Sequence, residues 1–451
     1  MKLRELIEFS NGRLIGEADL EKEISKFSID SRIVDDSTFF IPLKGENSDG
    51  HDYINSAFEK GAIGTFTSKE IDSIPGKVII KVDDTLVAMQ NVAKKLREKI
   101  KNIPLIAITG SVGKTTTKDM VYAVLNSKYR TLKTKGNFNN NIGMPLTLIN
   151  YANEEAIVLE MGMNHLGEIS FLSDIAKPDT AIIINVGHSH IGNLGSRENI
   201  LKAKMEIVDG MTDCGTLVIN GDNDMLKTVK NVKQKLIKFG FKDANDVTAY
   251  NIRVSDNATE FMVKEDEKEY KVKLNLVGEN FIYNALAAWV VGKIYGIIPE
   301  DRVKALANCE FTKMRMNIET KNDIILINDC YNASPESMKV ALEALSKQEA
   351  KRKIAILGDM LELGEYSDKL HEEVGENVAK NKIDKLYTVG KLAKNIKQGA
   401  INEGMDEQNI KSFNTLEELL NELKNLIQKG DAVLVKASRA MSFEKIINEL
   451  V

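Results

Sequence analysis

The residues with the clearest capacity for chemistry lie in the run Ile108–Thr117, which reads Ile-Thr-Gly-Ser-Val-Gly-Lys-Thr-Thr-Thr. Glycines in such a turn let backbone N–H groups converge on phosphate oxygens, and the start of a following helix adds positive potential. Lys114 would reach the terminal phosphates, and the Thr115 hydroxyl would ligate magnesium. The residues expected around the nucleotide phosphates are Gly110, Ser111, Val112, Gly113, Lys114, Thr115 and Thr116.

This run is a shortened phosphate-binding loop. The longer pattern G-x-x-x-x-G-K requires a glycine at the position that Ile108 occupies here. The alternative is an ordinary Gly/Ser turn between a strand and a helix. Because Gly113-Lys114-Thr115-Thr116 closely follows the apolar run 105–108, we favour the binding of ATP together with Mg²⁺.

A polar loop, residues 134–145, comes after the helix expected behind the phosphate loop, and it contains four asparagines and two glycines. Composition alone would fit an ordinary surface loop. Its position in the chain predicts instead that it contacts substrate. The candidate contacts are Asn137, Asn139 and Asn140.

Two further candidates stand at the carboxyl ends of expected parallel strands, where open α/β sheets bind their ligands. Glu160 ends the run 156–160 and could hold magnesium on the nucleotide phosphates. His190 ends the segment 185–190, which contains two of the five histidines, and could hold a second metal. The alternatives are a surface glutamate and a solvated loop histidine. Convergence with Thr115 favours the metal site.

Lys204 is unusual because helical spacing places it on an apolar stripe with Leu201, Met205 and Val208. A lysine in such a stripe is costly to bury unless it is paired or chemically altered. The alternative is a lysine at the edge of the stripe, whose ammonium group reaches water.

Three regions of the chain must position these residues. Residues 1–100 show short strand-like runs and end in an amphipathic helix near 86–100. Residues 101–312 alternate buried strands with helices, a pattern typical of a parallel sheet, and include a polar strand-rich section near 246–276. Residues 313–451 repeat the alternation on a smaller scale. The strands expected in the second and third regions are 105–108, 156–159, 181–184, 216–219, 324–327, 353–357, 385–389 and 432–435.

Composition excludes several classes of protein. The 451 residues are 43% hydrophobic and 28% charged, without a stretch near the roughly 20 apolar residues of a membrane span, so we expect no membrane insertion. A net charge of -5 argues against a nucleic-acid partner. Charges interrupt the N-terminal segment, which is unlike a signal peptide. Three scattered cysteines predict small core residues in a reducing compartment, and we expect a cytoplasmic protein.

Several runs together make the chain resemble the Mur ligases. They occur in family order and span nearly the whole chain. The matching runs are Thr109–Lys118, Gly136–Leu148, Glu160–Glu168, Asn185–His190, Gly195-Ser196 with Ala203–Ile207, Asn284–Ala288, Asn328–Met338, Leu357–Gly364 and Val435–Arg439.

The resemblance implies an α/β fold with three domains. These are a domain for a UDP-muramoyl peptide at 1–100, a central P-loop ATPase domain at 101–312 and a C-terminal Rossmann-like domain at 313–451. It also implies a ligase that uses ATP and Mg²⁺ to make an acyl phosphate. The segments Asn328–Met338 and Leu357–Gly364 are similar to those of the branch that joins D-alanyl-D-alanine to UDP-N-acetylmuramoyl-tripeptide. We expect it to be monomeric.

The resemblance also implies roles for single residues. Lys204 would be carbamylated, and its added carboxylate would ligate magnesium, while Thr115 and Glu160 hold one ion and His190 the other. Catalytic roles would fall to Lys114, Glu160, His190 and Lys204. Asn284 would meet the adenine, Arg315 a phosphate and Asp329 the ribose. Substrate contacts are implied for Ser31, Arg32, Lys44, Asn332 and Ser334.

One segment departs from the family pattern. Before Asn284 the family usually reads Gly-x-His-Asn, whereas this chain has Gly278-Glu279-Asn280-Phe281. Asn280 is then the candidate purine contact, and the usual asparagine at 281 is missing. The alternatives to a dipeptide-adding ligase are a sister ligase adding one amino acid, a folate polyglutamate synthetase, and a noncatalytic nucleotide switch. Lys114, Glu160, His190 and Lys204 argue against the switch, which has no need of a carbamylated lysine.

Overall fold

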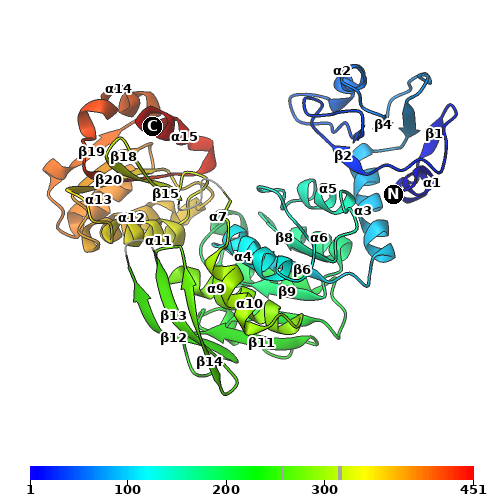
Figure 1. The fold of residues 1–451 in the computed structure, drawn as a ribbon. Helices are drawn as coiled ribbons and strands as arrows, with labels where there is room; N and C mark the ends of the chain where they lie inside the picture. Colours follow the sequence, from blue (N-terminus) through cyan, green and yellow to red (C-terminus); the bar gives the residue numbers. More distant parts are fainter. Residues whose placement is uncertain (256–257, 313–316) are drawn as a thin grey trace.

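The computed structural model describes residues 1–255, 258–312 and 317–451. In this part of the chain three sheets follow one another, each covered by its own helices (Figure 1). The N-terminal and C-terminal units stand apart, above the same side of the central unit. The α/β fold class and the three-domain architecture are therefore confirmed. The exact domain boundaries stay a prediction.

The N-terminal unit is built on a five-stranded sheet in the order β1-β5-β4-β3-β2, with only β1 antiparallel to its neighbour. Phe39 and Phe66 meet edge to face at 5.0 Å in its core. The elements are α1 (Leu3–Ser10), β1 (Arg13–Ile15), β2 (Lys26–Ser28), β3 (Thr38–Phe40), η1 (Gly50–Tyr53), α2 (Ile54–Glu59), β4 (Gly64–Thr67), β5 (Val78–Lys81) and α3 (Thr85–Lys99).

The central unit contains a nine-stranded sheet in the order β14-β13-β12-β11-β10-β9-β6-β8-β7. Strands β6 to β12 are parallel to their neighbours in this set, whereas β13 pairs antiparallel with both β12 and β14. The strands are β6 (Leu105–Thr109), β7 (Thr131–Lys133), β8 (Ala156–Glu160), β9 (Thr180–Ile183), β10 (Thr216–Asn220), β11 (Lys235–Gly240), β12 (Val247–Val254), β13 (Thr259–Glu265) and β14 (Lys268–Leu274). The helices are α4 (Lys114–Asn126), α5 (Gly143–Ile149), α6 (Glu168–Ala176), α7 (Ile191–Leu194), α8 (Arg197–Met205), η2 (Glu206–Val208), η3 (Leu226–Thr228), α9 (Asn280–Ile294) and α10 (Pro299–Ala307).

The C-terminal unit contains a six-stranded sheet in the order β15-β16-β20-β17-β18-β19, in which only β15 runs antiparallel to its neighbour. Its elements are β15 (Asn317–Lys321), β16 (Ile324–Asn328), α11 (Pro335–Ser346), β17 (Arg352–Gly358), η4 (Gly364–Tyr366), α12 (Ser367–Lys380), β18 (Lys385–Val389), α13 (Lys394–Asn402), η5 (Glu407–Asn409), β19 (Ile410–Phe413), α14 (Leu416–Leu426), β20 (Asp431–Lys436), η6 (Arg439–Met441) and α15 (Glu444–Leu450).

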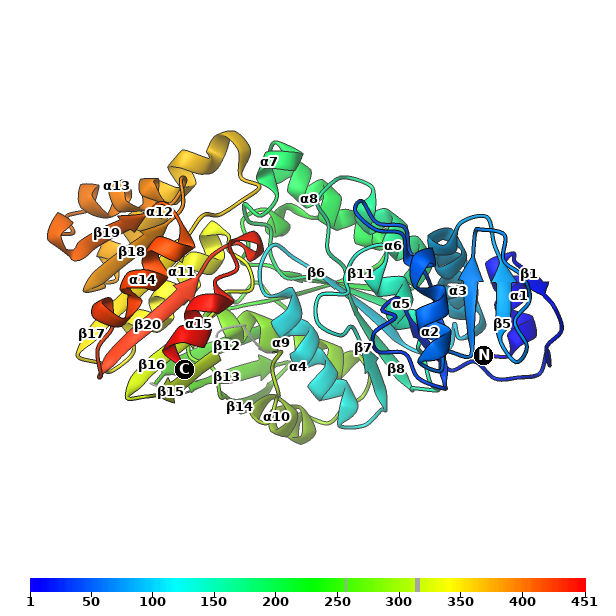
Figure 2. The same cartoon turned by 90° about the horizontal axis from the view of Figure 1, so that it is seen from above.

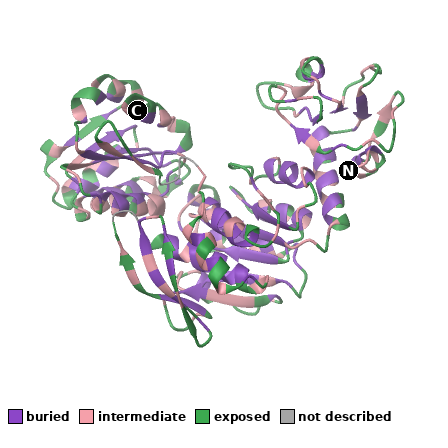
Figure 3. Ribbon diagram, in the orientation of Figure 1, coloured by how far each residue is buried: buried purple, intermediate pink, exposed green. Residues whose placement is uncertain are grey.

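The strands predicted from apolar runs are confirmed because their residues are buried on both faces of a covered parallel sheet (Figure 3). The polar section near 246–276 forms β12, β13 and β14, and the helix expected near 86–100 is α3. Arg97 of α3 is buried and donates to the carbonyls of Ala176 and Lys177, which ties α3 to the end of α6.

One of the three cysteines lies at the surface. Cys330 is buried, but Cys214 is exposed, so the prediction that all three cysteines are core residues is wrong. Cys214 follows the turn after η2, where the chain passes over the surface before β10. Among the described residues, no helix combines the length and the apolar character needed to cross a bilayer.

Strand order determines where a ligand can lie. The chain leaves β6 to form β7 and β8 on one side of it, and then returns to form β9 on the other side. The carboxyl end of β6 is therefore a topological switch point, where the loops after neighbouring strands diverge and leave a crevice. Seen from above, the C-terminal unit flanks this part of the central sheet (Figure 2).

Candidate functional site

A cavity of about 980 Å³ lies at the switch point and is lined from both the central and the C-terminal units. The predicted residues that line it are Ser111, Val112, Gly113, Lys114, Thr115, Thr116, Asn137, Asn139, Asn140, Glu160, His190, Asn284, Asp329, Asn332 and Ser334. They come from segments that are widely separated in the sequence. The predicted nucleotide and substrate residues of these two units are thus largely brought together.

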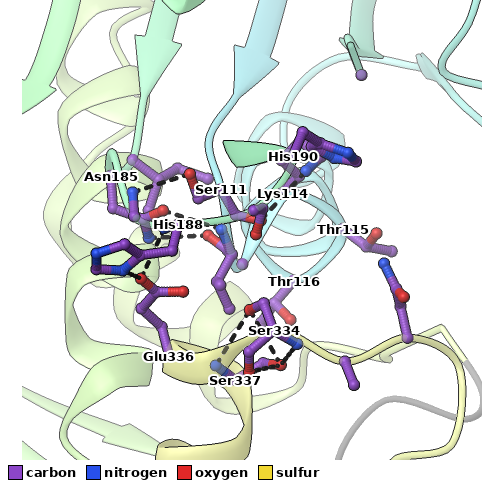
Figure 4. A pocket seen from close by; sticks show the side chains of 18 of the residues that line it. Ser111, Lys114, Thr115, Thr116, Asn185, His188, His190, Ser334, Glu336 and Ser337 are labelled. Carbon is purple, nitrogen blue, oxygen red and sulfur yellow. Dashed lines mark hydrogen bonds and ion pairs between the residues drawn. The ribbon is translucent and has the colours of Figure 1, made fainter. Parts of the chain in front are cut away.

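The phosphate loop is held in an open turn before α4. Gly113 has a φ of 86°, in the left-handed region where a residue without Cβ is favoured. The amide side chain of Asn185 brackets Val112, since its Oδ1 accepts from the backbone N–H and its Nδ2 donates to the backbone oxygen. Lys114 Nζ donates to the carbonyl of Gly110 at 2.7 Å. The loop therefore presents the N-terminus of α4 to the cavity, the arrangement that suits an anion (Figure 4).

Glu160 is buried at the end of β8, with 1% of its surface exposed. The register pairs Ile108 of β6 with Glu160, which places the carboxylate beside the start of the phosphate loop. Its Oε2 accepts from the Thr115 hydroxyl at 3.0 Å, and its Oε1 accepts from Asn139 Nδ2 at 2.8 Å. The alternative of a surface glutamate is wrong, and the polar loop reaches the site through Asn139.

Lys204 is fully enclosed, with 1% of its surface exposed, so the alternative of an edge lysine reaching water is wrong. It does not line the cavity. Burial, and next the charge of Lys114, lower the pKa of Lys204 well below its usual value, while Glu336 acts in the opposite direction. A lysine amine of low pKa is uncharged more often at neutral pH, and an uncharged amine is the form that reacts with CO₂.

The predicted apolar stripe around Lys204 is only partly correct. Helix α8 ends at Met205 and a 3₁₀ turn follows, so the helical spacing does not continue to Val208. Leu201 and Met205 are half-buried. The side chains buried alongside Lys204 are Ile200, Ala203 and Ile207.

Two histidines after β9 contact the C-terminal unit. The backbone N–H of His188 donates to Oε1 of Glu336 at 2.8 Å. Ring Nδ1 of His188 lies 2.7 Å from the same oxygen (Figure 4). His190 lines the cavity, and its ring Nδ1 lies 2.5 Å from Oε2 of Glu362. Burial raises the pKa of the Glu336 carboxyl, but hydrogen bonds, chiefly from His188, lower it by more. The pKa of Glu336 is therefore below its usual value.

The side of the cavity expected to hold adenine carries aromatic residues. Asn284 of α9 is buried and touches the phosphate loop, since a Cβ at Gly113 would lie 2.9 Å from its Oδ1. Asn280 is exposed and Phe281 is buried, and both line the cavity. Tyr283 stacks on Phe241 at 4.3 Å. A purine contact from Asn280 stays a prediction.

On the C-terminal side, Asp329 is buried at the end of β16 and forms an ion pair with Lys436 of β20. Lys436 Nζ also donates to the carbonyl of Asn332 at 2.9 Å. Ser334 is the N-cap of α11 and exchanges hydrogen bonds with Ser337. Its hydroxyl therefore organises the helix start, whereas the predicted contact with substrate stays a prediction.

Some predicted residues lie elsewhere. Ser31, Arg32 and Lys44 belong to the N-terminal unit and do not line the cavity. The exposed Arg32 pairs with Asp30, and the Arg32 hydrogen bonds hold the pKa of that carboxyl at about 2. Gly110 does not line the cavity, although its carbonyl accepts a hydrogen bond from Lys114. Arg315 lies outside the described residues.

Four residues for which the sequence predicted no role also line the cavity: Asn185, Glu336, Glu362 and Lys436. All four stand inside runs that resemble the Mur family, so position within such a run was the available signal. Their contacts join segments distant in sequence, which spacing along the chain does not reveal.

The donor set fits magnesium. A buried carboxylate and a hydroxyl, Glu160 and Thr115, are hard oxygen ligands that lie 3.0 Å apart beside the phosphate loop. Among the described residues, no cluster of three or more His, Cys, Asp or Glu side chains could hold a metal by itself. Mg²⁺ is usually bound by one or two carboxylates together with substrate phosphates and water, so a small protein donor set is sufficient.

Comparison with known proteins places the whole chain in one family. Residues 108–292 match the Mur ligase middle domain, residues 314–439 the Mur ligase glutamate ligase domain, and residues 23–104 the Mur ligase family catalytic domain. The UDP-N-acetylmuramoyl-tripeptide--D-alanyl-D-alanine ligase of Bacillus subtilis is 39% identical over 453 residues, covering 100% of this chain and 98% of the relative.

Solved structures agree with this assignment. MurF from Acinetobacter baumannii superposes with a TM-score of 0.88 at 31% identity, covering 100% of this chain and 98% of the other. The MurF ligase of Thermotoga maritima in complex with ADP superposes with a TM-score of 0.80 at 30% identity, covering 95% of this chain and 97% of the other. This chain therefore belongs to the Mur ligase family and is an ATP-dependent ligase.

Proposed function

We propose that the protein joins D-alanyl-D-alanine to UDP-N-acetylmuramoyl-tripeptide at the expense of ATP, giving the UDP-muramoyl-pentapeptide precursor of peptidoglycan. The observation that carries the proposal is the sequence identity, over the full length, to relatives named UDP-N-acetylmuramoyl-tripeptide--D-alanyl-D-alanine ligase. This identity is 39% for the relative in Bacillus subtilis. The cavity supports it, because a phosphate loop and a C-terminal segment face each other across one space.

The reaction requires a carboxylate to become electrophilic. The terminal phosphoryl group of ATP is transferred to the C-terminal carboxylate of the tripeptide, which gives an acyl phosphate, and the amine of the dipeptide then displaces phosphate. Lys114, at the N-terminus of α4, neutralises charge on the transferring group. Because the cavity is lined from two units, approach of these units would exclude water that would otherwise hydrolyse the acyl phosphate.

Magnesium would be held by Thr115 and Glu160 at one position, and by His190 and a carbamate on Lys204 at the other. When bound, it supplies positive charge that brings the two anionic substrates together and stabilises the transferred phosphoryl group. Asn139 would orient Glu160 through the hydrogen bond to Oε1. The enclosed environment of Lys204 supports the carbamate, since an uncharged amine there is less costly than an ammonium.

The contacts of the remaining predicted residues are part of the same proposal. Asn284 and Asn280 would meet the purine, Asp329 the ribose and Arg315 a phosphate. Asn137, Asn140, Asn332 and Ser334 would contact the peptide or the dipeptide, and Ser31, Arg32 and Lys44 the UDP-muramoyl end. A monomer and a cytoplasmic location are further predictions of this assignment.

A substrate panel tests the proposal. Purified protein with ATP and Mg²⁺ should release phosphate only when UDP-N-acetylmuramoyl-tripeptide and D-alanyl-D-alanine are both present. Single amino acids, D-alanine among them, serve as matched controls for the dipeptide. Equal turnover with a single amino acid would contradict the assignment in favour of a sister ligase, and uncoupled ATP hydrolysis without either substrate would favour a nucleotide switch.

A further inference from the structure

The contact between Glu362 and His190 joins the C-terminal unit to a predicted metal ligand. We propose that Glu362 is a positioning residue, whose carboxylate fixes the ring of His190 and leaves Nε2 as the nitrogen available to a metal. The same contact makes this metal position depend on docking of the 359–366 loop against α7. The inference rests on the proposed function, in which His190 ligates magnesium.

The geometry determines the tautomer. Nδ1 of His190 lies 2.5 Å from Oε2 of Glu362, and an ionised carboxylate only accepts hydrogen bonds, so Nδ1 carries the proton. Among the described residues, Nε2 of this ring makes no hydrogen bond. Metal-binding histidines commonly donate their other ring N–H to a carboxylate, which sets ring orientation and raises the basicity of the ligand.

Side chains alone would hold this pair weakly. The Glu362 side chain is 49% exposed and the His190 side chain 20%, and a pair exposed to this extent is screened by water. The contact therefore needs a backbone that brings the two residues together before the side chains meet.

The backbone around Glu362 provides that support. Glu362 has a φ of 64°, a left-handed conformation that residues with a side chain seldom adopt and that persists only when the surroundings enforce it. Its carbonyl accepts from the backbone N–H of Gly192 at 3.0 Å. Four residues further on, the Tyr366 hydroxyl donates to the carbonyl of Gly195 at 3.0 Å. Gly192 lies in α7, and Gly195 is the C-cap residue of the same helix.

The two segments also interlock at glycines. A Cβ added at Gly192 would lie 2.6 Å from the backbone nitrogen of Gly364 and 2.8 Å from the carbonyl oxygen of Glu362. Contacts below about 3.0 Å would force one backbone away from the other. The close approach therefore requires the glycine at position 192.

Hydrogen bonds within the C-terminal unit hold the 359–366 loop on the side away from α7. The backbone N–H of Met360 donates to Nε2 of the buried His371 at 2.9 Å, and that of Leu361 donates to the Ser438 hydroxyl at 2.9 Å. Because the loop is fixed to its own unit on one side and to α7 on the other, a shift of the C-terminal unit carries Glu362 away from His190.

Binding of Mn²⁺, a paramagnetic substitute for Mg²⁺, measures the proposed effect. Electron paramagnetic resonance would follow Mn²⁺ bound to the full chain with a non-hydrolysable ATP analogue. Glu362→Ala should weaken the His190-dependent Mn²⁺ site by about 10- to 100-fold. Glu362→Gln keeps an acceptor oxygen without the charge, so its Mn²⁺ affinity should lie between those of Glu362→Ala and wild type. Glu365→Ala, which removes an exposed carboxylate three residues along the same loop, should bind Mn²⁺ as wild type does.

A second variant separates docking from the side-chain contact. Gly192→Ala keeps both His190 and Glu362 but prevents the close approach of α7 to the 359–366 loop. It should therefore lower the Mn²⁺ affinity as much as Glu362→Ala does. Ring ¹⁵N spectra of a chain with five histidines give an independent reading, since His190 should hold one tautomer in wild type and exchange between two in both variants. Thermal unfolding would verify that each variant is folded.

The outcomes separate the role of Glu362 from the metal-binding role of His190. Wild-type Mn²⁺ affinity and an unchanged ring tautomer in Glu362→Ala would overturn the positioning role of Glu362 alone. If His190→Ala itself leaves Mn²⁺ binding unchanged, the metal assignment under the proposed function fails, and the positioning role fails with it.

Discussion

Nδ2 of Asn139 donates a hydrogen bond to Oε1 of Glu160 across 2.8 Å, which joins the polar loop to the end of β8. The other carboxylate oxygen accepts from Thr115 on the first turn of α4. Glu160 is thus oriented from two sides, and each oxygen keeps lone pairs directed elsewhere.

The first prediction concerns this contact. Asn139→Ala should raise the Mg²⁺ concentration needed for half-maximal turnover by about 10- to 100-fold, because the orienting partner of a metal ligand is lost. A Mg²⁺ titration at saturating ATP measures this half-maximal concentration. Asn141→Ala, at an exposed position on the same loop, is the matched control. An unchanged Mg²⁺ requirement in Asn139→Ala would contradict the role of Asn139.

The second prediction concerns Lys204. Lys204→Ala should reduce turnover roughly 100- to 1,000-fold, because a charge-stabilising group is removed from the transition state. Short carboxylic acids should partly restore it by occupying the place of the carbamate. Lys202→Ala, on the same helix but exposed, should retain turnover close to wild type. Full activity of Lys204→Ala would exclude the metal-ligand role.

The third prediction concerns the close approach of Gly113 to Asn284. Gly113→Ala should raise the KM for ATP roughly tenfold, equivalent to about 1.4 kcal/mol, because the added Cβ would lie 2.9 Å from the Asn284 amide and the left-handed backbone would be strained. Gly404→Ala imposes similar strain, with a φ of 98°, but nothing lies within 4 Å. Equal effects of the two substitutions on KM would show that strain alone is responsible.

The fourth prediction is a pH dependence of stability that originates in His371. This ring is buried and accepts from the Met360 N–H, and burial lowers its pKa below the ordinary value of 6.5. The unfolded chain therefore binds the proton more readily than the folded one. The contribution of His371 to stability is fully present above about pH 6.5 and is lost as the pH falls through the folded pKa.

Thermal unfolding at pH 8, 6.5 and 5 tests this dependence. Wild type should lose stability below pH 6.5. His371→Gln should be less stable than wild type at pH 8 but should lose less on acidification, because the glutamine does not titrate. Parallel pH profiles for the two proteins would show that His371 stays protonated to the same extent in the folded and unfolded chain.

Much of the site followed from local sequence pattern. The phosphate loop, Glu160 and His190 were predicted because strand ends and glycine turns have local signatures, and in a parallel sheet all carboxyl ends lie at one edge. For Lys204 the sequence left burial and an edge position open as alternatives, and its buried neighbours were not predicted, because the helix changes to a 3₁₀ turn after Met205. The exposure of Cys214 and the capping role of Ser334 were not predicted either.

The sequence by itself determined the three α/β units, the phosphate loop and the residues at the strand ends, because these depend on periodicity and turn chemistry within short segments. Only the tertiary structure decided which carboxylates face these residues. The pairs His188–Glu336 and His190–Glu362 join positions 148 and 172 residues apart. Such contacts depend on how the C-terminal unit packs against the central one, and no local pattern specifies the packing of two separately folded surfaces.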